Sequence, residues 1–227
     1  NAFDKAAEAY RLAELSPDTL KVEEKYEIGY SFYRTGDYEG SVMWLSSVAA
    51  MGDSLSQIAS FQLGNALMKQ KHNREAMNAY AEAFRTGYNP DIAEMALFNQ
   101  AKLAILLNDN QSIGLLDKYV KLFPQKANAK EATKLKARLL INTDSYREAV
   151  SLLDGLGELD AQTEEVYQKV TLARGMELYK SRNFSGALEL FEKCAARRAN
   201  ADYAAQAMFW KAEALMLQGN ESAAVSA

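Results

Sequence analysis

Apolar residues recur along this chain at steps of three and four positions, the spacing that places side chains on one face of an α-helix. Between residues 26 and 48, two such stretches are joined by the polar turn Thr35-Gly36-Asp37. The first stretch carries its apolar face on Tyr26, Ile28, Gly29, Phe32 and Tyr33. The pattern therefore predicts a pair of short amphipathic helices connected by a tight turn.

The same pattern returns along the whole chain at intervals of 35 to 38 residues. A small residue marks each first helix, at Gly29, Gly64, Ala101, Ala137, Gly175 and Ala212. Twelve positions later a second helix carries Ser41, Ala76, Ile113, Ala149, Ala187 and Ala224, of which all but Ile113 are small. Four positions further on, a bulky residue follows in most copies, at Leu45, Tyr80, Leu153 and Phe191. Two closely packed helices need a small side chain where they cross, and a bulky neighbour fills the groove beside the crossing.

The spacing predicts one solenoid over residues 1–227, because a single helix pair cannot bury its apolar face alone. Five fuller repeats are expected at 22–53, 57–90, 94–124, 130–156 and 168–200. Residues 1–17 match a second helix ended by Pro17, and residues 205–227 match another truncated repeat. We therefore expect the chain to be a piece of a longer array.

Two stretches depart from the regular pattern. In the third repeat Ile113 stands at the small position and the turn Asn108-Asp109-Asn110 has no aromatic residue after it, so we expect a wider crossing or a local bend there. The stretch 154–165 contains two glycines and five acidic residues. It is either a long turn between repeats, since loops tolerate insertion, or a hinge between two sub-arrays.

The alternation of small and bulky positions resembles the tetratricopeptide repeat family, whose period is about 34 residues. The resemblance covers nearly the whole chain and implies an all-α, right-handed superhelix, that is, an α-solenoid of helix-turn-helix repeats. The turn and helix sequences YRTGDYEGS and KLFPQKANAKEA are similar in pattern to those of bacterial tetratricopeptide proteins of the cell envelope, over two or three repeats. This similarity favours the periplasm or cell envelope over the cytoplasm.

The resemblance also implies a concave groove built from the first helices. Its wall uses the positions three before, one after and four after the small residue. The partner-binding residues expected there, with the basic residues of the rim, are Tyr26, Tyr30, Tyr33, Arg34, Phe61, Asn65, Met68, Lys69, Phe98 and Lys102. The wall then continues through Ile105, Lys134, Arg138, Ile141, Leu172, Met176, Tyr179, Phe209, Glu213 and Met216.

Aromatic side chains with polar tips are favoured at protein interfaces, so this wall predicts a site for a protein or peptide partner. The expected function is a non-catalytic interaction scaffold or adaptor. Two alternatives stay open: an architectural, self-associating arm, and a non-catalytic region of a larger envelope enzyme or sensor. A clamp for the C-terminal tails of chaperones is disfavoured. Domains of that kind resemble one another in having a lysine at the position that Phe61 occupies here.

Composition narrows these functions further. Of the 227 residues, 48% are hydrophobic and 25% charged, and the net charge of −4 disfavours nucleic acid as a partner. No apolar run approaches the roughly 18 residues of a membrane span, so no direct membrane insertion is expected. His72 lies in a predicted turn, and Cys194 falls where a buried thiol is expected. We found no catalytic or phosphate-binding motif and no metal-ligand spacing, so no enzyme activity, cofactor or metal is expected.

Overall fold

The computed structural model describes residues 2–12 and 20–226, and in this part of the chain the regular structure is entirely helical. Pro17, the predicted end of the first helix, lies outside the described residues. The helices are α1 (Ala2–Leu12), α2 (Val22–Thr35), α3 (Tyr38–Ala49), α4 (Ser54–Lys69), α5 (Asn73–Thr86), α6 (Pro90–Leu106), α7 (Ser112–Leu122), α8 (Ala129–Ile141), α9 (Tyr146–Asp154), α10 (Ala161–Lys180), α11 (Phe184–Ala195), α12 (Ala201–Leu217) and α13 (Glu221–Val225).

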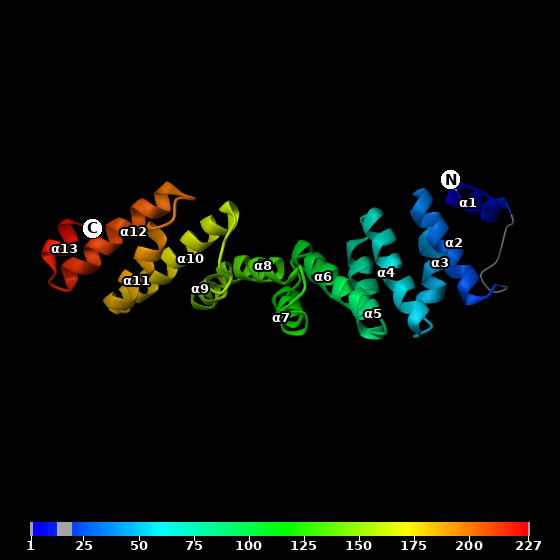
Figure 1. The fold of residues 1–227 in the computed structure, drawn as a ribbon, viewed down its shortest axis with the longest axis horizontal. Coiled ribbons are helices and arrows are strands. Elements are labelled where there is room, and N and C mark those ends of the chain that lie inside the picture. Colours follow the sequence, from blue (N-terminus) through cyan, green and yellow to red (C-terminus); the bar gives the residue numbers. More distant parts are fainter. Residues whose placement is uncertain (1, 13–19, 227) are drawn as a thin grey trace. The chain divides into compact units, whose positions relative to one another are not determined.

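The chain forms two compact units, residues 1–126 and residues 127–227. In unit 1, α1 precedes the pairs α2/α3, α4/α5 and α6/α7, and unit 2 contains the pairs α8/α9, α10/α11 and α12/α13 (Figure 1). Within each unit, every helix packs against the next, and each first helix also contacts the first helix of the following pair. The predicted all-α solenoid of helix-turn-helix pairs is thus confirmed.

Every first helix ends in the same backbone turn, seven residues after its small residue. The residue there has a positive φ in all six pairs: Gly36, Lys71, Asn108, Asp144, Arg182 and Gly219. The following N–H reaches back five residues to a helix carbonyl, as in Asp37 N to Phe32 O at 3.0 Å and Asn183 N to Leu178 O at 2.8 Å. This left-handed closure satisfies carbonyls that a helix end otherwise leaves unpaired. It reverses the chain in three residues and sets the second helix against the first.

The crossings of paired helices explain why the repeat needs small residues. A Cβ added to Gly64 would lie 2.7 Å from the Tyr80 ring, and one added to Gly175 would lie 2.6 Å from the Phe191 ring. At Gly29 the nearest atom is Leu45 Cγ, at 2.9 Å. The bulky side chains therefore occupy the space that the glycines leave, and each pair is closely packed.

The third pair keeps this packing in a shifted register. The expected small residue, Ile113, is half-buried, whereas Ser112, Leu116 and Tyr119 are buried at the spacing that the other second helices use. Helix α7 begins at Ser112, and its buried face lies one position earlier in the sequence than the repeat spacing predicts. Assigning the small position to Ile113 was therefore wrong; Ser112 occupies it.

Two buried glutamines fix the loops that lead from one pair to the next. Gln57 Nε2 donates to the carbonyls of Ala83 and Asn89 at 3.1 and 3.0 Å, and Asn89 N donates to Gln57 Oε1 at 2.6 Å. Gln168 makes the corresponding bonds to Cys194, Arg197 and Asn200 in unit 2. All polar atoms of these buried amides are satisfied, as burial requires.

The loop that each glutamine holds ends in a helix cap. Asn89 Oδ1 accepts from the N–H groups of Asp91 and Ile92, and Asn200 Oδ1 accepts from those of Asp202 and Tyr203. Such caps satisfy N–H groups that lack a partner within the helix. The glutamine thus positions the residue that starts the next first helix.

The stretch 154–165, expected to be a long turn or a hinge, is only partly irregular. Helix α9 ends at Asp154 and α10 begins at Ala161, with Asp160 Oδ1 accepting from Thr163 N at 2.9 Å. Asp154 bonds to Tyr167 and forms an ion pair with Lys193 at 2.9 Å. A hinge at this stretch stays a prediction; the two compact units meet in sequence at residues 126 and 127.

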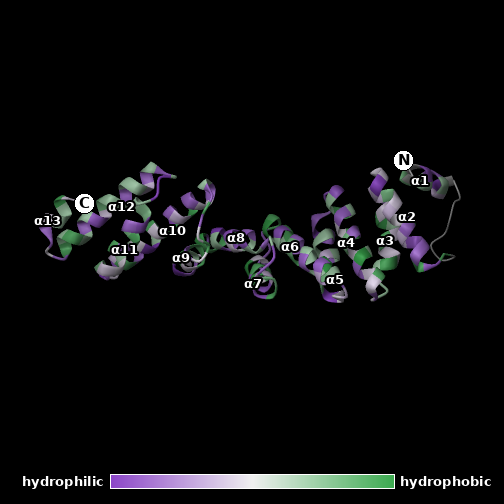
Figure 2. Ribbon diagram, in the orientation of Figure 1, coloured by the Kyte–Doolittle hydropathy of each residue, from purple (hydrophilic) through white to green (hydrophobic). Residues whose placement is uncertain are grey.

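Hydropathy alternates around most helices, so apolar faces turn inward within each unit (Figure 2). The largest side chains with almost no exposure include Tyr119, Phe191, Ile28 and Leu45, all of which lie at helix contacts. The core is therefore a continuous row of interhelical contacts in each unit, as a repeat architecture requires.

The close crossing at Gly64 predicts opposite effects for two glycine-to-alanine substitutions in unit 1. Gly64→Ala should lower the free energy of unfolding by about 1–3 kcal/mol, because the Tyr80 ring must move. Gly114→Ala should raise it by up to about 1 kcal/mol, since its Cβ meets nothing within 4 Å and alanine favours the helix. Urea unfolding followed by circular dichroism measures both, and equal effects would contradict the crossing.

Candidate functional site

The predicted groove wall in unit 1 lies on three first helices in contact with one another, α2 with α4 and α4 with α6. The structure brings the predicted residues onto this row but exposes them unequally. Four side chains are exposed: Arg34, Met68, Lys69 and Lys102. Five are half-buried: Tyr26, Tyr30, Tyr33, Phe61 and Asn65. Phe98 is buried, with its ring 5.2 Å from that of Tyr119, so it supports the wall from beneath.

At the α1 end of this row the aromatic rings pack on each other. Tyr26 and Tyr30 stack with centroids 6.0 Å apart, and the Phe3 ring meets Tyr30 edge-on at 5.8 Å. The Arg34 guanidinium lies 4.7 Å from the centre of the Phe3 ring and donates to Tyr30 Oη at 3.1 Å. A cavity of about 360 Å³ opens beside Tyr26 and Tyr30. This part of the wall is therefore partly covered by α1 rather than fully open.

The centre of the row is a polar group built around Tyr80 of α5. Its ring lies against Gly64 and 5.6 Å from the Phe61 ring, and its hydroxyl donates to Asn65 Oδ1 at 2.7 Å. Asn65 Nδ2 in turn donates to Gln62 Oε1 at 3.1 Å. The amide of Asn65 is thus held in one orientation, with one Nδ2 hydrogen still available.

Burial dominates the acid–base behaviour of Tyr80. Desolvation and the neighbouring Tyr33 raise the pKa of Tyr80 to about 12, against a hydrogen bond from Asn99 that lowers it. Tyr80 therefore stays a neutral donor under ordinary conditions. The sequence placed Tyr80 only at a helix crossing. The available signal of a role in the groove was that Gly64, its partner in this crossing, directly precedes the wall residue Asn65.

The exposed cations of the row have no carboxylate partner. Arg34, Lys69 and Lys102 form no ion pair with any residue that the structure describes. Lys102 instead lies 5.6 Å from the centre of the Phe98 ring. An apolar row with amides and unpaired cations at its edge is suited to bind a polar, extended chain through both hydrogen bonds and charge.

The wall positions of unit 2 are different in character. Lys134 is engaged by Asp160 in an ion pair, and Leu172 is buried. Phe209 and Met216 are exposed on α12, and Tyr179 is half-buried with its ring 5.3 Å from that of Trp210. The predicted wall of unit 2 thus carries a paired charge on α8 and exposed apolar side chains on α12.

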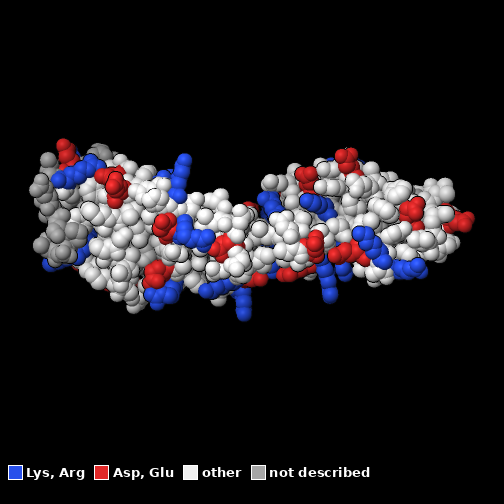
Figure 3. Space-filling model, turned by 180° about the vertical axis from the view of Figure 1, so that it is seen from behind, with Lys and Arg blue, Asp and Glu red and all other residues white. Residues whose placement is uncertain are grey.

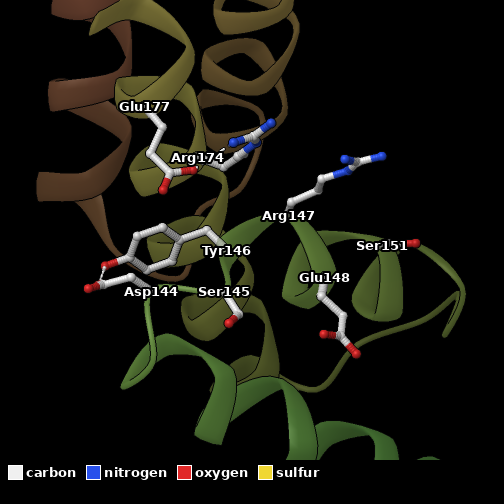
Figure 4. Close-up of a pocket in the computed structure, with 8 residues that line it drawn as sticks. All are labelled: Asp144, Ser145, Tyr146, Arg147, Glu148, Ser151, Arg174 and Glu177. Atoms are coloured by element: carbon white, nitrogen blue, oxygen red, sulfur yellow. Dashed lines mark hydrogen bonds and ion pairs between the residues drawn. The ribbon is translucent and has the colours of Figure 1, made fainter. Parts of the chain in front are cut away.

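A cavity of about 430 Å³ lies between the start of α9 and α10 (Figure 4). Several of its polar groups have partners: Tyr146 donates to Asp144 at 2.5 Å, Arg174 contacts Glu177 at 2.8 Å, and Glu148 is bound by Lys136. The exposed Arg147 also lines the cavity, so its charged lining contains both signs.

Neither His72 nor Cys194 offers a reactive group with partners. His72 lies exposed in the turn before α5, as predicted. Cys194 is fully buried, burial raises the pKa of its thiol to about 11, and Sγ lies 3.3 Å from Gln168 O. Within the described ranges, no cluster of three or more histidine, cysteine, aspartate or glutamate side chains is placed to hold a metal ion.

Surface charges of both signs are interspersed on the face shown in Figure 3. The described helices include none with the length and apolar character needed to cross a bilayer.

Comparisons with known proteins connect this fold to solved structures. In sequence comparisons no family model and no curated protein matches the chain. The structure is similar to that of YrrB, which is described as a TPR protein with an unusual peptide-binding site. The two share 18% identity with a TM-score of 0.56, and the match covers 91% of this chain and 97% of that chain. It is also similar to MamA, at 16% identity, TM-score 0.53, and coverage of 78% and 95%. A tetratricopeptide repeat protein from Parabacteroides merdae matches at 18% identity, TM-score 0.55, and coverage of 90% and 76%. The chain thus has the fold of tetratricopeptide repeat proteins.

The buried hydroxyl of Tyr80 predicts a specific pH dependence of stability. A pKa raised from 10.0 to about 12 means that the folded state favours the neutral phenol, so this contribution is complete below pH 10 and is lost as the pH rises toward 12. Tyr80→Phe should make the unfolding free energy fall less steeply over that range. At pH 8 it should cost about 0.5–1.5 kcal/mol, because the hydrogen bond to Asn65 is removed.

Urea unfolding at several pH values measures this difference. Tyr88→Phe is the control, since Tyr88 is 63% exposed and its loss should leave stability at pH 8 unchanged. If the unfolding free energy of the Tyr80→Phe protein fell as steeply between pH 10 and 12 as that of the parent, Tyr80 would not be the source of this pH dependence.

Proposed function

We propose that this chain is a non-catalytic interaction scaffold and that the row of first helices in unit 1 binds an extended segment of a partner protein. The observation that carries the proposal is the fixed amide of Asn65, held between Tyr80 and Gln62. A side chain ordered before binding loses little entropy when it meets a ligand. Its remaining N–H is suited to a main-chain carbonyl of the partner.

The surroundings of Asn65 supply the rest of the contact surface. Met68 is 39% exposed and offers flexible apolar area next to the amide. Lys69 and Lys102 extend the surface on α4 and α6 with charges that have no ion-pair partner in the described part of unit 1. These features favour a partner segment with apolar side chains and some negative charge.

The similar structures support the same kind of function. YrrB carries a peptide-binding site according to its description, and it shares the helix-pair fold at 18% identity. At that identity the fold alone is shared, so the binding residues are argued from Asn65 and its neighbours in this chain. Self-association and a role inside a larger envelope enzyme or sensor remain alternatives that binding data would separate.

A phage-displayed library of random peptides, selected on this chain, tests the proposal. Peptides enriched on the parent should bind the double variant Met68→Ser/Lys102→Gln at least about tenfold more weakly, because apolar contact and charge are both lost. Both substituted side chains are exposed, so the helical circular dichroism signal should not change. Affinities measured by fluorescence polarisation give the comparison.

The control carries the same chemical changes on second helices. Met43→Ser/Lys121→Gln alters exposed residues of α3 and α7 and should leave peptide affinity at the parent value. Failure to enrich any peptide, or an equal loss of affinity in both double variants, would rule out the unit 1 groove as the binding site.

A further inference from the structure

A second cavity, in unit 2, has a chemistry unlike that of the unit 1 row. It measures about 300 Å³ and is lined by Tyr179, Lys180, Arg182, Phe184 and Leu217. These residues come from the end of α10, the turn after it, the start of α11 and the end of α12. Cavities of this size accommodate small organic ligands. We call it the α10–α12 cavity.

The apolar lining of this cavity is aromatic and firmly supported. The Tyr179 ring meets Phe184 at 5.6 Å and Trp210 at 5.3 Å, both nearly edge-on, and Trp210 meets Phe209 at 5.1 Å. Leu217 is 58% exposed at the rim. Rings held by one another offer apolar area at low entropic cost, so an apolar group could bind here without reordering the protein.

The charged lining is entirely positive. Lys180 and Arg182 are exposed, and neither forms an ion pair with any residue in the described part of the chain. No aspartate or glutamate lines the cavity. The cavity of Figure 4, by contrast, is lined by carboxylates as well as by arginines, and the cavity beside Tyr26 is lined by Glu27. The α10–α12 cavity thus combines apolar rings with two unneutralised cations.

The backbone holds Arg182 at the mouth in a costly conformation. Its φ is +61°, in the left-handed region that disfavours residues with a Cβ, whereas glycine occupies the corresponding positions 36 and 219. The turn is closed on both sides of it, by Arg182 N to Tyr179 O at 3.0 Å and Asn183 N to Leu178 O at 2.8 Å. The backbone that carries the Arg182 side chain is therefore fixed at the edge of the cavity that Phe184 also lines.

We propose that the α10–α12 cavity binds a small apolar organic anion, an aromatic or branched aliphatic group that carries a carboxylate. The apolar body lies against Phe184, Tyr179 and Leu217. The carboxylate is held by Lys180 and by Arg182, whose guanidinium matches its geometry. This site lies in unit 2 and stands independently of peptide binding in unit 1.

The two tryptophans of the chain provide a direct test with 5-fluorotryptophan and ¹⁹F NMR. Trp210 contacts the cavity residue Tyr179, whereas Trp44 is buried in unit 1 and serves as an internal reference. Titration with 4-phenylbutyrate should shift the Trp210 signal in a saturable manner and leave the Trp44 signal in place. The uncharged 4-phenylbutyramide, which has the same apolar body, should bind at least about tenfold more weakly because it lacks the charge.

Variants then assign the charge to this site. Lys180→Gln/Arg182→Gly should reduce the affinity for 4-phenylbutyrate at least about tenfold. Glycine suits the left-handed conformation at 182, so the variant should remain as stable as the parent, and unfolding cannot explain the loss. The matched control is Lys71→Gly/Lys121→Gln, which removes two exposed charges from unit 1 and likewise introduces glycine at a left-handed position. It should retain the parent's affinity.

Three results would overturn the proposal. The first is the absence of a saturable shift of the Trp210 signal with 4-phenylbutyrate. The second is equal binding of the acid and the amide, which would reduce the site to unspecific apolar contact. The third is an equal loss of affinity in the control variant, which would assign the effect to overall charge and not to Lys180 and Arg182.

Discussion

The close approach of paired helices is the constraint on which the rest of the structure depends. At Gly29, Gly64 and Gly175 the backbone leaves no room for a Cβ, because a bulky side chain of the second helix already fills that space. Interior packing at this density tolerates little change of volume. The distance between the paired helices is thereby fixed, and it constrains the spacing of successive first helices, which carry the candidate binding residues.

Tyr80 shows how architecture and binding site depend on the same residue. Its ring fills the crossing at Gly64, while its hydroxyl holds the amide of Asn65. A change of packing at this crossing would move the Asn65 amide, because the ring that packs against Gly64 also carries the hydroxyl that bonds to the amide. The candidate site in unit 1 is thus preorganised by the core itself, and its polar centre lies on helices rather than on loops, which gives it a well-defined geometry.

The sequence alone predicted the helix pairs, because small and bulky residues at fixed spacing reflect a packing need that every copy shares. It did not predict the shifted register of α7, because the buried Ser112 follows Ala101 by eleven residues instead of twelve and the spacing rule therefore selected Ile113. It also could not separate exposed from supporting rings. Phe98 and Met68 occupy wall positions of neighbouring repeats, yet Phe98 is covered by Tyr119 and Met68 is not. That difference arises from the packing of α7 on α6, whose shifted register places the Tyr119 ring against Phe98. The cations of the α10–α12 cavity, similarly, become neighbours of Leu217 only after folding.

The glutamine braces have a consequence for how such an array tolerates changes of length. Gln57 and Gln168 each bond to a backbone 32 residues further along the chain, in both directions of hydrogen bonding. One residue inserted or deleted in the loop before Asn89 or Asn200 would break several buried bonds at once. The irregular stretch between α9 and α10 carries no such glutamine, and its bonds there come from side chains near its two ends. Insertions and fusion points for engineering this protein therefore belong in that stretch. The two loops bonded to Gln57 and Gln168 must keep their length.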